Sequence, residues 1–163
     1  MRAYASSMRR DISPQEEAER LCRLRDDDGF DAFKFRIGSE CGRGVDQWPG
    51  RTAEIIEMLP KALGDNVVKM VDANSCYDVS QAIEIGKMLE ANGIVHYEEP
   101  CPYWKPDWTR EVTHALTIDV TGGEQDCDIR HWLDMIKRHV VDVLQPDVMY
   151  MGGLTPTLEL ADI

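Results

Sequence analysis

Residues 67–72, Val-Val-Lys-Met-Val-Asp, form a short run of apolar and β-branched residues that ends in a carboxylate, which is typical of a buried strand. Similar runs return at 94–97, 116–120 and 140–144, and each is followed by an acid. The four acids, Asp72, Glu98, Glu124 and Asp147, are 26, 26 and 23 residues apart. A near-constant period of this size indicates a repeated supersecondary unit.

A helix is expected in each interval between these strands. Asp78 and Asp128 are placed to cap two of the helices, and a third, shorter helix follows Asp107. Upstream, Ser13-Pro14-Gln15-Glu16 is a capping box that opens a helix ending near Gly29, and a strand at 32–37 and a helix at 52–63 follow it. A weak strand at 3–5 and a helix starting at Thr155-Pro156 complete the series.

Alternating strands and helices with short loops predict a parallel sheet, because parallel neighbours need crossover connections. Acids at the ends of several successive strands favour a barrel, in which those ends meet in one ring. We predict an α/β fold: a partial (β/α)8-type TIM barrel of about six strand–helix units, forming a single domain over residues 1–163. A complete barrel needs eight units, so the last strands are expected to lie outside the chain, unless the architecture is unusual.

Composition restricts the function classes. The 163 residues carry 30 acids and 18 bases, a net charge of −12 that disfavours binding to nucleic acid or to an anionic membrane surface. We expect neither a membrane span nor a signal peptide, because no apolar run is long enough for either, and five cysteines without a CxxC pair favour neither disulfides nor a zinc ribbon. A cytoplasmic protein with a small-molecule ligand fits these features.

Asp72, Glu98 and Glu124, one from each of three adjacent strands, are the candidate metal ligands. Three carboxylates at one barrel mouth would repel one another unless a cation neutralised them, and Mg²⁺ prefers such hard oxygen donors. The alternative is that each acid merely ends a strand and caps the next helix. The near-equal spacing, with Glu98 in Glu-Glu-Pro and Glu124 after Gly-Gly, favours the metal. A thiolate site at Cys76, Cys101 and Cys127 is disfavoured, because their matching offsets follow from the repeat itself.

Lys34 and Arg36 lie two residues apart on the 32–37 strand, so both project from one face. If that face points into the barrel, a substrate carboxylate or developing negative charge would explain the two cations. The alternative is an ordinary, half-exposed strand.

These motifs together resemble the barrel domain of the enolase superfamily, in particular its mandelate racemase-like group. Lys34-Phe35-Arg36 is similar to the Lys-x-Lys motif of the second strand, and Asp72-Ala73-Asn74 to the Asp-x-Asn of the third. The remaining matches are Glu98-Glu99-Pro100, Gly123-Glu124 and Gln145-Pro146-Asp147. The resemblance covers residues 3 to about 160.

The resemblance implies that Asp72, Glu98 and Glu124 hold Mg²⁺, that Asn74 lies near the substrate, and that Lys34, Arg36 and Asp147 take part in catalysis. It also implies a C-terminal barrel whose capping domain lies outside the chain, and a homo-oligomeric full-length enzyme. Members of the family remove a proton alpha to a carboxylate, and the metal stabilises the resulting enediolate.

Two departures from the family pattern narrow the reaction. The second lysine of the motif, a base in the family, is Arg36 here, and a guanidinium stays protonated near neutrality. The family also pairs Asp147 with a seventh-strand histidine, yet all four histidines precede Asp147, so that histidine is expected beyond Ile163. A single base favours dehydration of a sugar acid to a 2-keto-3-deoxy acid. A racemase, epimerase or cycloisomerase, or an inactive metal-binding fragment, are the alternatives.

Overall fold

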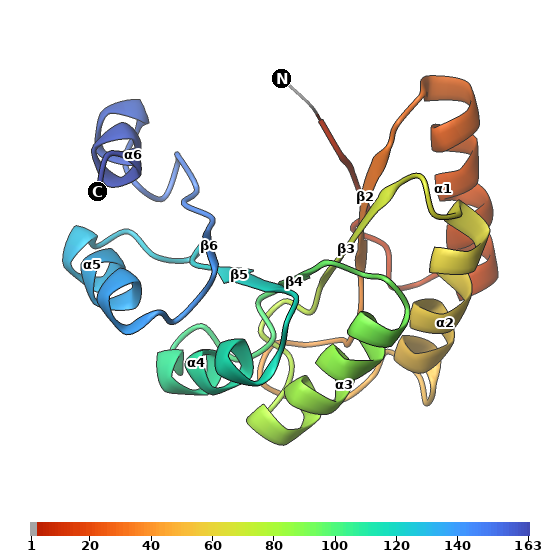
Figure 1. Cartoon of the computed structure of the whole chain (residues 1–163), viewed down its shortest axis with the longest axis horizontal. Coiled ribbons are helices and arrows are strands. Elements are labelled where there is room, and N and C mark those ends of the chain that lie inside the picture. Colours follow the sequence, from red (N-terminus) through yellow and green to blue (C-terminus); the bar gives the residue numbers. More distant parts are fainter. Residues whose placement is uncertain (1–2) are drawn as a thin grey trace.

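The computed structural model describes residues 3–163, in which six strands alternate with six helices (Figure 1). The strands are β1 (Ala5–Ser6), β2 (Ala32–Arg36), β3 (Val68–Asp72), β4 (His96–Glu98), β5 (Asp119–Gly122) and β6 (Val143–Leu144). The helices are α1 (Pro14–Asp28), α2 (Arg51–Leu63), α3 (Val79–Ala91), α4 (Pro106–Ala115), α5 (Ile129–Arg138) and α6 (Leu154–Ala161). The predicted alternation of strand and helix is confirmed.

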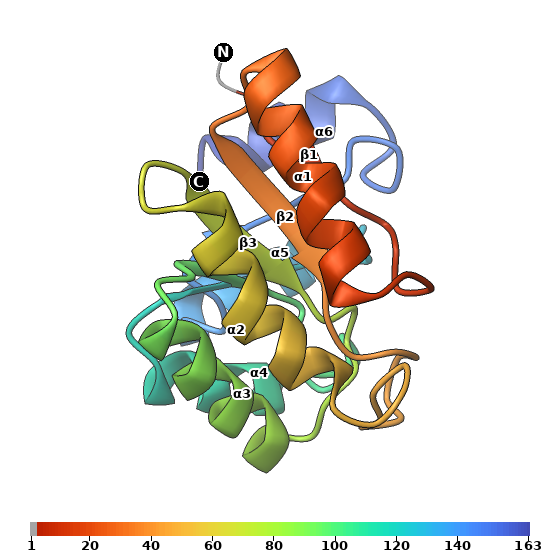
Figure 2. The ribbon, with the colours of Figure 1, turned by 90° about the vertical axis from the view of Figure 1, so that its right-hand side faces the viewer.

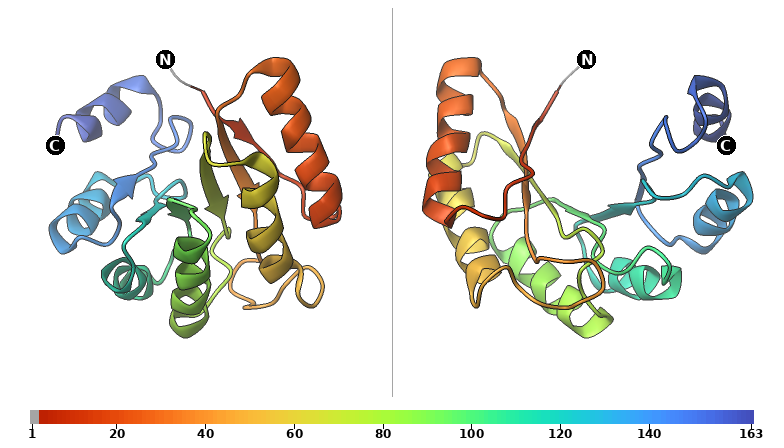
Figure 3. Two further views of the ribbon diagram at one scale, coloured as in Figure 1. Left: turned by 45° about the vertical axis from the view of Figure 1, so that its right-hand side comes forward. Right: turned by 180° about the vertical axis from the view of Figure 1, so that it is seen from behind.

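All strand pairs are parallel, and the sheet order is the chain order from β1 to β6. The sheet curves into an incomplete cylinder with the helices on its outer side, as the two views in Figure 3 show. Within residues 3–163, β1 and β6 are the two edges of the sheet. The structure therefore confirms a partial (β/α)8-type barrel of six units.

The strands predicted at 94–97, 116–120 and 140–144 begin two or three residues later in the structure, because amides at their starts donate to helix ends or to Glu90. The Ile94 amide donates to the Leu89 carbonyl at the end of α3, and the Val140 amide donates to Met135 of α5. The Thr117 amide is taken by the Glu90 carboxylate, and sheet pairing begins at Asp119. An amide that already donates to a helix end or to a carboxylate cannot also join the hydrogen bonds of the sheet. Strands β4, β5 and β6 therefore begin later than the apolar runs do.

The helix starts are mostly where the capping residues place them. The capping boxes of Ser13 with Glu16 and of Asp78 with Gln81 are both formed, and Asp128 caps α5. Two predicted starts are displaced. Helix α4 begins at Pro106, before Asp107, and α6 begins at Leu154, before Thr155; neither has a side-chain cap.

Strand alternation separates two environments. On β2, Phe33 and Phe35 belong to the hydrophobic core under the helices, where α1 and α2 lie side by side (Figure 2). Lys34 and Arg36 project to the other face, inside the cylinder, where they contact carboxylates of β3 and β4. The interpretation of an ordinary half-exposed strand is wrong, because all five residues of β2 are buried. No helix in the described part of the chain is long and apolar enough to cross a bilayer.

Packing dictates one glycine of the Gly122-Gly123 pair at the end of β5. Gly123 has φ 105°, and a Cβ on it would lie 2.1 Å from Cη2 of the fully buried Trp132. Gly122 has ordinary backbone geometry, and the nearest atoms to its Cβ position lie at 3.8 Å. Only the second glycine is therefore required by the turn that leads to Glu124.

We expect Gly123→Ala to lower the free energy of unfolding by about 2–5 kcal/mol, since backbone strain and overpacking add. Gly122→Ala should change it by less than about 1 kcal/mol. Gly93 has φ 69°, and no atom lies within 4 Å of its Cβ position. Gly93→Ala therefore measures the cost of backbone strain without that of a steric clash. Urea denaturation of the three variants measures each effect, and equal losses at positions 122 and 123 would contradict the assignment.

Candidate metal centre

The centre is built on one row of the sheet. The register places Arg36 beside Asp72, Asp72 beside Glu98, and Glu98 beside Thr121. Asp72 and Glu98 are 0% and 2% exposed, so two carboxylates share a buried position at the C-terminal ends of β3 and β4. Neighbouring strands therefore bring two of the three candidate ligands together.

Two cations neutralise this pair. The Arg36 guanidinium donates from Nη1 to Asp72 Oδ2. Lys34 lies two residues before Arg36 on β2, and its long side chain brings Nζ to Glu98 Oε2 and to within 3.8 Å of Asp72 Oδ2. The interior cations predicted from the sequence are thus held against the acids.

The two acids have opposite pKa shifts. Burial, followed by the negative charge of Glu98, raises the pKa of Asp72 to about 6 despite Arg36 and Lys34. Burial also favours the neutral form of Glu98, but the His96 ring, with Nε2 3.9 Å from Oε2, and the hydrogen bond from Lys34 outweigh it and lower the pKa of Glu98 to about 2. Glu98 therefore keeps its negative charge to lower pH than Asp72 does.

Glu124, the third predicted ligand, lies apart from this pair. It follows β5 by two residues, and its carboxylate accepts a hydrogen bond of 3.3 Å from Gln125. Among residues 3–163, no three His, Cys, Asp or Glu side chains are arranged as a ready-made metal site. The structure thus brings together two of the three predicted ligands, and shared coordination by all three stays a prediction.

The donor set nevertheless fits a hard divalent cation. Asp72 and Glu98 offer buried carboxylate oxygens that now depend on Lys34 and Arg36 for their counter-charge. Glu124 is near enough that its charge is the largest effect, after burial, in raising the pKa of Glu99 to about 7. A shared ion would use Glu124 together with the carboxylate oxygens that the two cations leave, Asp72 Oδ1 and Glu98 Oε1.

Strained backbone surrounds the site. Asn74, Ser75 and Glu99 have φ values of 49°, 59° and 43°, in the left-handed region that non-glycine residues seldom adopt. All three follow the carboxylates at the ends of β3 and β4. Such strain persists only where surrounding contacts impose it, and it is concentrated at functional sites.

Asn74, the predicted substrate residue, borders the pair directly. Its amide donates to Asp72 Oδ1 at 2.7 Å, and its side-chain Oδ1 accepts from Arg10 Nη2 at 3.1 Å. Asp147 is farther along the chain, and its carboxylate accepts from the amides of Met149 and Tyr150. Its predicted role of orienting a histidine is not tested by these contacts.

Sequence reasoning assigned no role to several residues of the centre. Gln145 donates to Glu98 Oε2 at 3.2 Å, and Thr121 Oγ1 lies 3.0 Å from His96 Nε2. Glu99 is buried, and its Oε1 has no hydrogen-bond partner among the described residues. The strand period was the available signal for His96, which lies two residues before Glu98 and shares its face.

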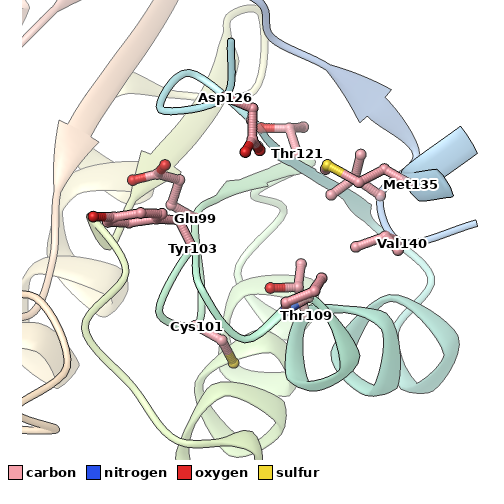
Figure 4. Close-up of a pocket in the computed structure, with 12 residues that line it drawn as sticks. Glu99, Cys101, Tyr103, Thr109, Thr121, Asp126, Met135 and Val140 are labelled. Carbon is pink, nitrogen blue, oxygen red and sulfur yellow. The ribbon is translucent and has the colours of Figure 1, made fainter. Parts of the chain in front are cut away.

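Two cavities lie near the ends of β3, β4 and β5. The one drawn in Figure 4, with Glu99 and Tyr103 on one side and Met135 and Val140 on the other, holds about 20 Å³, which suits a water molecule but no sugar acid. A second cavity of about 270 Å³ is large enough for a small ligand. Its lining residues come from the loops after β2 to β5: Ser39, Cys41, Asn74, Ser75, Glu99, Tyr103 and Gln125.

Comparison with known proteins finds matches over nearly the whole chain. A crystal structure of a candidate racemase from Roseobacter denitrificans is 57% identical, with a TM-score of 0.98, over 99% of this chain and 44% of that one. A mandelate racemase/muconate lactonizing protein from Paracoccus denitrificans, crystallised with magnesium, is 29% identical with a TM-score of 0.88, over 98% and 42% of the two chains.

Arabinonate dehydratase from Saccharolobus solfataricus is 26% identical over 90% of this chain and 39% of its own length. Other relatives are also sugar-acid dehydratases and cycloisomerases. The chain spans about two-fifths of the length of the first of these relatives. The sequence profile described as "Enolase C-terminal domain-like" matches residues 16–163. The chain therefore belongs to the enolase superfamily, as a partial barrel of its mandelate racemase/muconate lactonizing type.

Proposed function

We propose that this chain supplies the metal-binding half of a Mg²⁺-dependent enzyme that removes a proton alpha to a carboxylate. The observation that carries the proposal is the buried row Arg36–Asp72–Glu98, with Lys34 reaching into it from below. Asp72 and Glu98, joined by Glu124, would hold the ion. When bound, the ion would supply the positive charge that stabilises the enediolate.

The chain's own residues supply further stabilisation. Lys34 and Arg36 are buried cations with fixed positions beside the acids. Preorganised charge of this kind lowers the barrier because it needs no reorganisation when negative charge develops on the substrate. Arg36 serves as an electrostatic clamp and not as a base, since its guanidinium stays protonated. Asn74 and the loops of the larger cavity would orient the substrate.

Dehydration of a sugar acid is the reaction we favour. A single base on the face opposite Lys34 would take the alpha proton and return it to the leaving hydroxyl, giving a 2-keto-3-deoxy acid after tautomerisation. Asp147 would orient that base, which we expect from sequence outside the 163 residues. The curated relatives that are sugar-acid dehydratases support this choice.

Racemisation, epimerisation or cycloisomerisation is the second candidate. The likeness to a candidate racemase at 57% identity favours it, as do cycloisomerases among the relatives. In this case Lys34 would act as the base on its face. Metal binding without turnover is a third outcome for the isolated chain, since it spans only part of its relatives.

The metal proposal predicts that Glu124→Gln weakens the binding of Mn²⁺, a paramagnetic probe for the Mg²⁺ site, by at least about tenfold, because a charged oxygen ligand is lost. Glu40→Gln is the matched control, since Glu40 is an exposed acid paired with Arg43. Electron paramagnetic resonance of free Mn²⁺ during titration measures both variants. Unchanged affinity in Glu124→Gln would remove Glu124 from the site.

The reaction proposal predicts different behaviour for the isolated chain and the full-length protein. With Mg²⁺ and a panel of sugar acids, the 163-residue chain should form little or no 2-keto acid, because no histidine follows Asp147. The full-length protein that carries it should convert at least one of these acids, as measured by semicarbazone absorbance. Robust dehydration by the chain alone would show that no outside base is needed, and inverted stereochemistry without a keto product would favour the racemase.

A further inference from the structure

Arg10 and Arg36 lie beside the acid pair, and Arg51 supports them from the start of α2. Arg36 bonds to Asp72, whereas the hydrogen bonds of Arg10 and Arg51 within residues 3–163 go to Asn74 and to backbone carbonyls. The buried Nε atoms of Arg10, Arg36 and Arg51 all lack a hydrogen-bond partner in this part of the chain. Buried cationic donors without acceptors cost stability, so the corner formed by Arg10 and Arg36 suits an anion.

Arg10 and Arg36 flank one corner of the site. Arg10 Nη2 donates to Asn74 Oδ1, the Asn74 amide donates to Asp72 Oδ1, and Arg36 donates to Asp72 Oδ2. This chain of contacts brings the two guanidiniums near each other, and burial, followed by the positive charge of Arg36, lowers the pKa of Arg10.

Arg51 fixes the backbone that carries both. It is fully buried at the start of α2, with its guanidinium over the Trp48 ring. Its Nη1 donates to the Arg36 carbonyl at 3.0 Å and its Nη2 to the Arg9 carbonyl at 3.4 Å. The end of β2 and the loop after β1 are therefore held together, and the two arginines need little rearrangement to grip a ligand.

Met8 occupies the position beside Arg36 that a ligand could take. Within residues 3–163, the Met8 sulfur is the single hydrogen-bond partner of Arg36 Nη2, at 3.0 Å, and Met8 is 68% exposed. A thioether is a weak acceptor, and an exposed side chain moves aside readily. A carboxylate oxygen would replace it with a stronger, charge-assisted bond.

We propose that Arg10 is a specificity-determining residue that, together with Arg36, forms a seat for the carboxylate of a sugar acid in the place of the Met8 sulfur. The identity of the ligand as a sugar acid rests on the proposed function. The seat itself requires no metal, which allows it to be tested separately.

The test is a ligand-observed NMR titration of the 163-residue chain with D-gluconate in buffer containing EDTA. Wild type should bind gluconate, with an affinity that falls as salt is raised, and should not bind the uncharged polyol D-glucitol. Arg10→Gln should weaken gluconate binding by at least about tenfold. Arg10→Lys keeps the charge but loses the planar edge, and should bind with intermediate affinity.

Arg9→Gln is the matched control, because the Arg9 side chain is half exposed and pairs with Asp11. Gluconate affinity should be unchanged in this variant. Equal affinity of wild type and Arg10→Gln, or equal binding of gluconate and glucitol, would overturn the seat. Equal affinity of Arg10→Lys and wild type would overturn the role of the guanidinium edge.

Mn²⁺ titration of the same proteins separates this proposal from the metal proposal. Arg10→Gln should bind Mn²⁺ as wild type does. A chain that binds gluconate through Arg10 but binds no Mn²⁺ would support the seat and refute the proposed metal centre. A chain that binds Mn²⁺ while Arg10→Gln leaves gluconate binding intact would do the reverse.

Discussion

The structure depends on charge balance in one buried row of the sheet. Asp72 and Glu98 are neighbours in register, and neither is accessible enough for water to stabilise its charge. An isolated buried carboxylate costs several kcal/mol, on the order of what a whole domain has to spare, so each acid must be paired. Lys34 and Arg36 meet this need because alternation along β2 directs both into the cylinder. The two cations that neutralise the buried acids are also the ones that the proposed reaction would use.

Because Lys34 and Arg36 already neutralise the two buried acids, the three candidate ligands need not gather around one point in the structure. Lys34 and Arg36 contact Glu98 Oε2 and Asp72 Oδ2, and the Glu124 carboxylate accepts a hydrogen bond from Gln125 instead. A divalent ion would share the two acids with these cations by taking the other carboxylate oxygens. In the proposed reaction, Lys34 and Arg36 would keep their positions and face the substrate anion. Metal binding and substrate binding would thus be coupled through two shared carboxylates.

The sequence predicted the order of elements and the convergence of Asp72 with Glu98, because strand period and helix capping are local signals. It did not predict where β4, β5 and β6 begin, since the first amides of those apolar runs are taken by helix ends or by Glu90. The direction of the Glu124 side chain and the roles of Glu99, Gln145 and Arg10 depend on contacts between loops distant in the chain. Spacing alone carries no information about such contacts.

The arginines around Asp72 and Glu98 indicate how the barrel could favour a different reaction while the metal-binding acids stay the same. Replacing a lysine by Arg36 removes a proton acceptor but adds donors that can grip a carboxylate in a planar fork. Such a fork is useful only if it is held in position, and Arg51 does this by bonding to the backbone of Arg36 and of Arg9. Arg10 then joins from the loop after β1 through Asn74. A corner with these fixed guanidiniums favours binding and stabilising an anion over shuttling protons on that face, so the base of the proposed reaction would lie on the other side of the substrate.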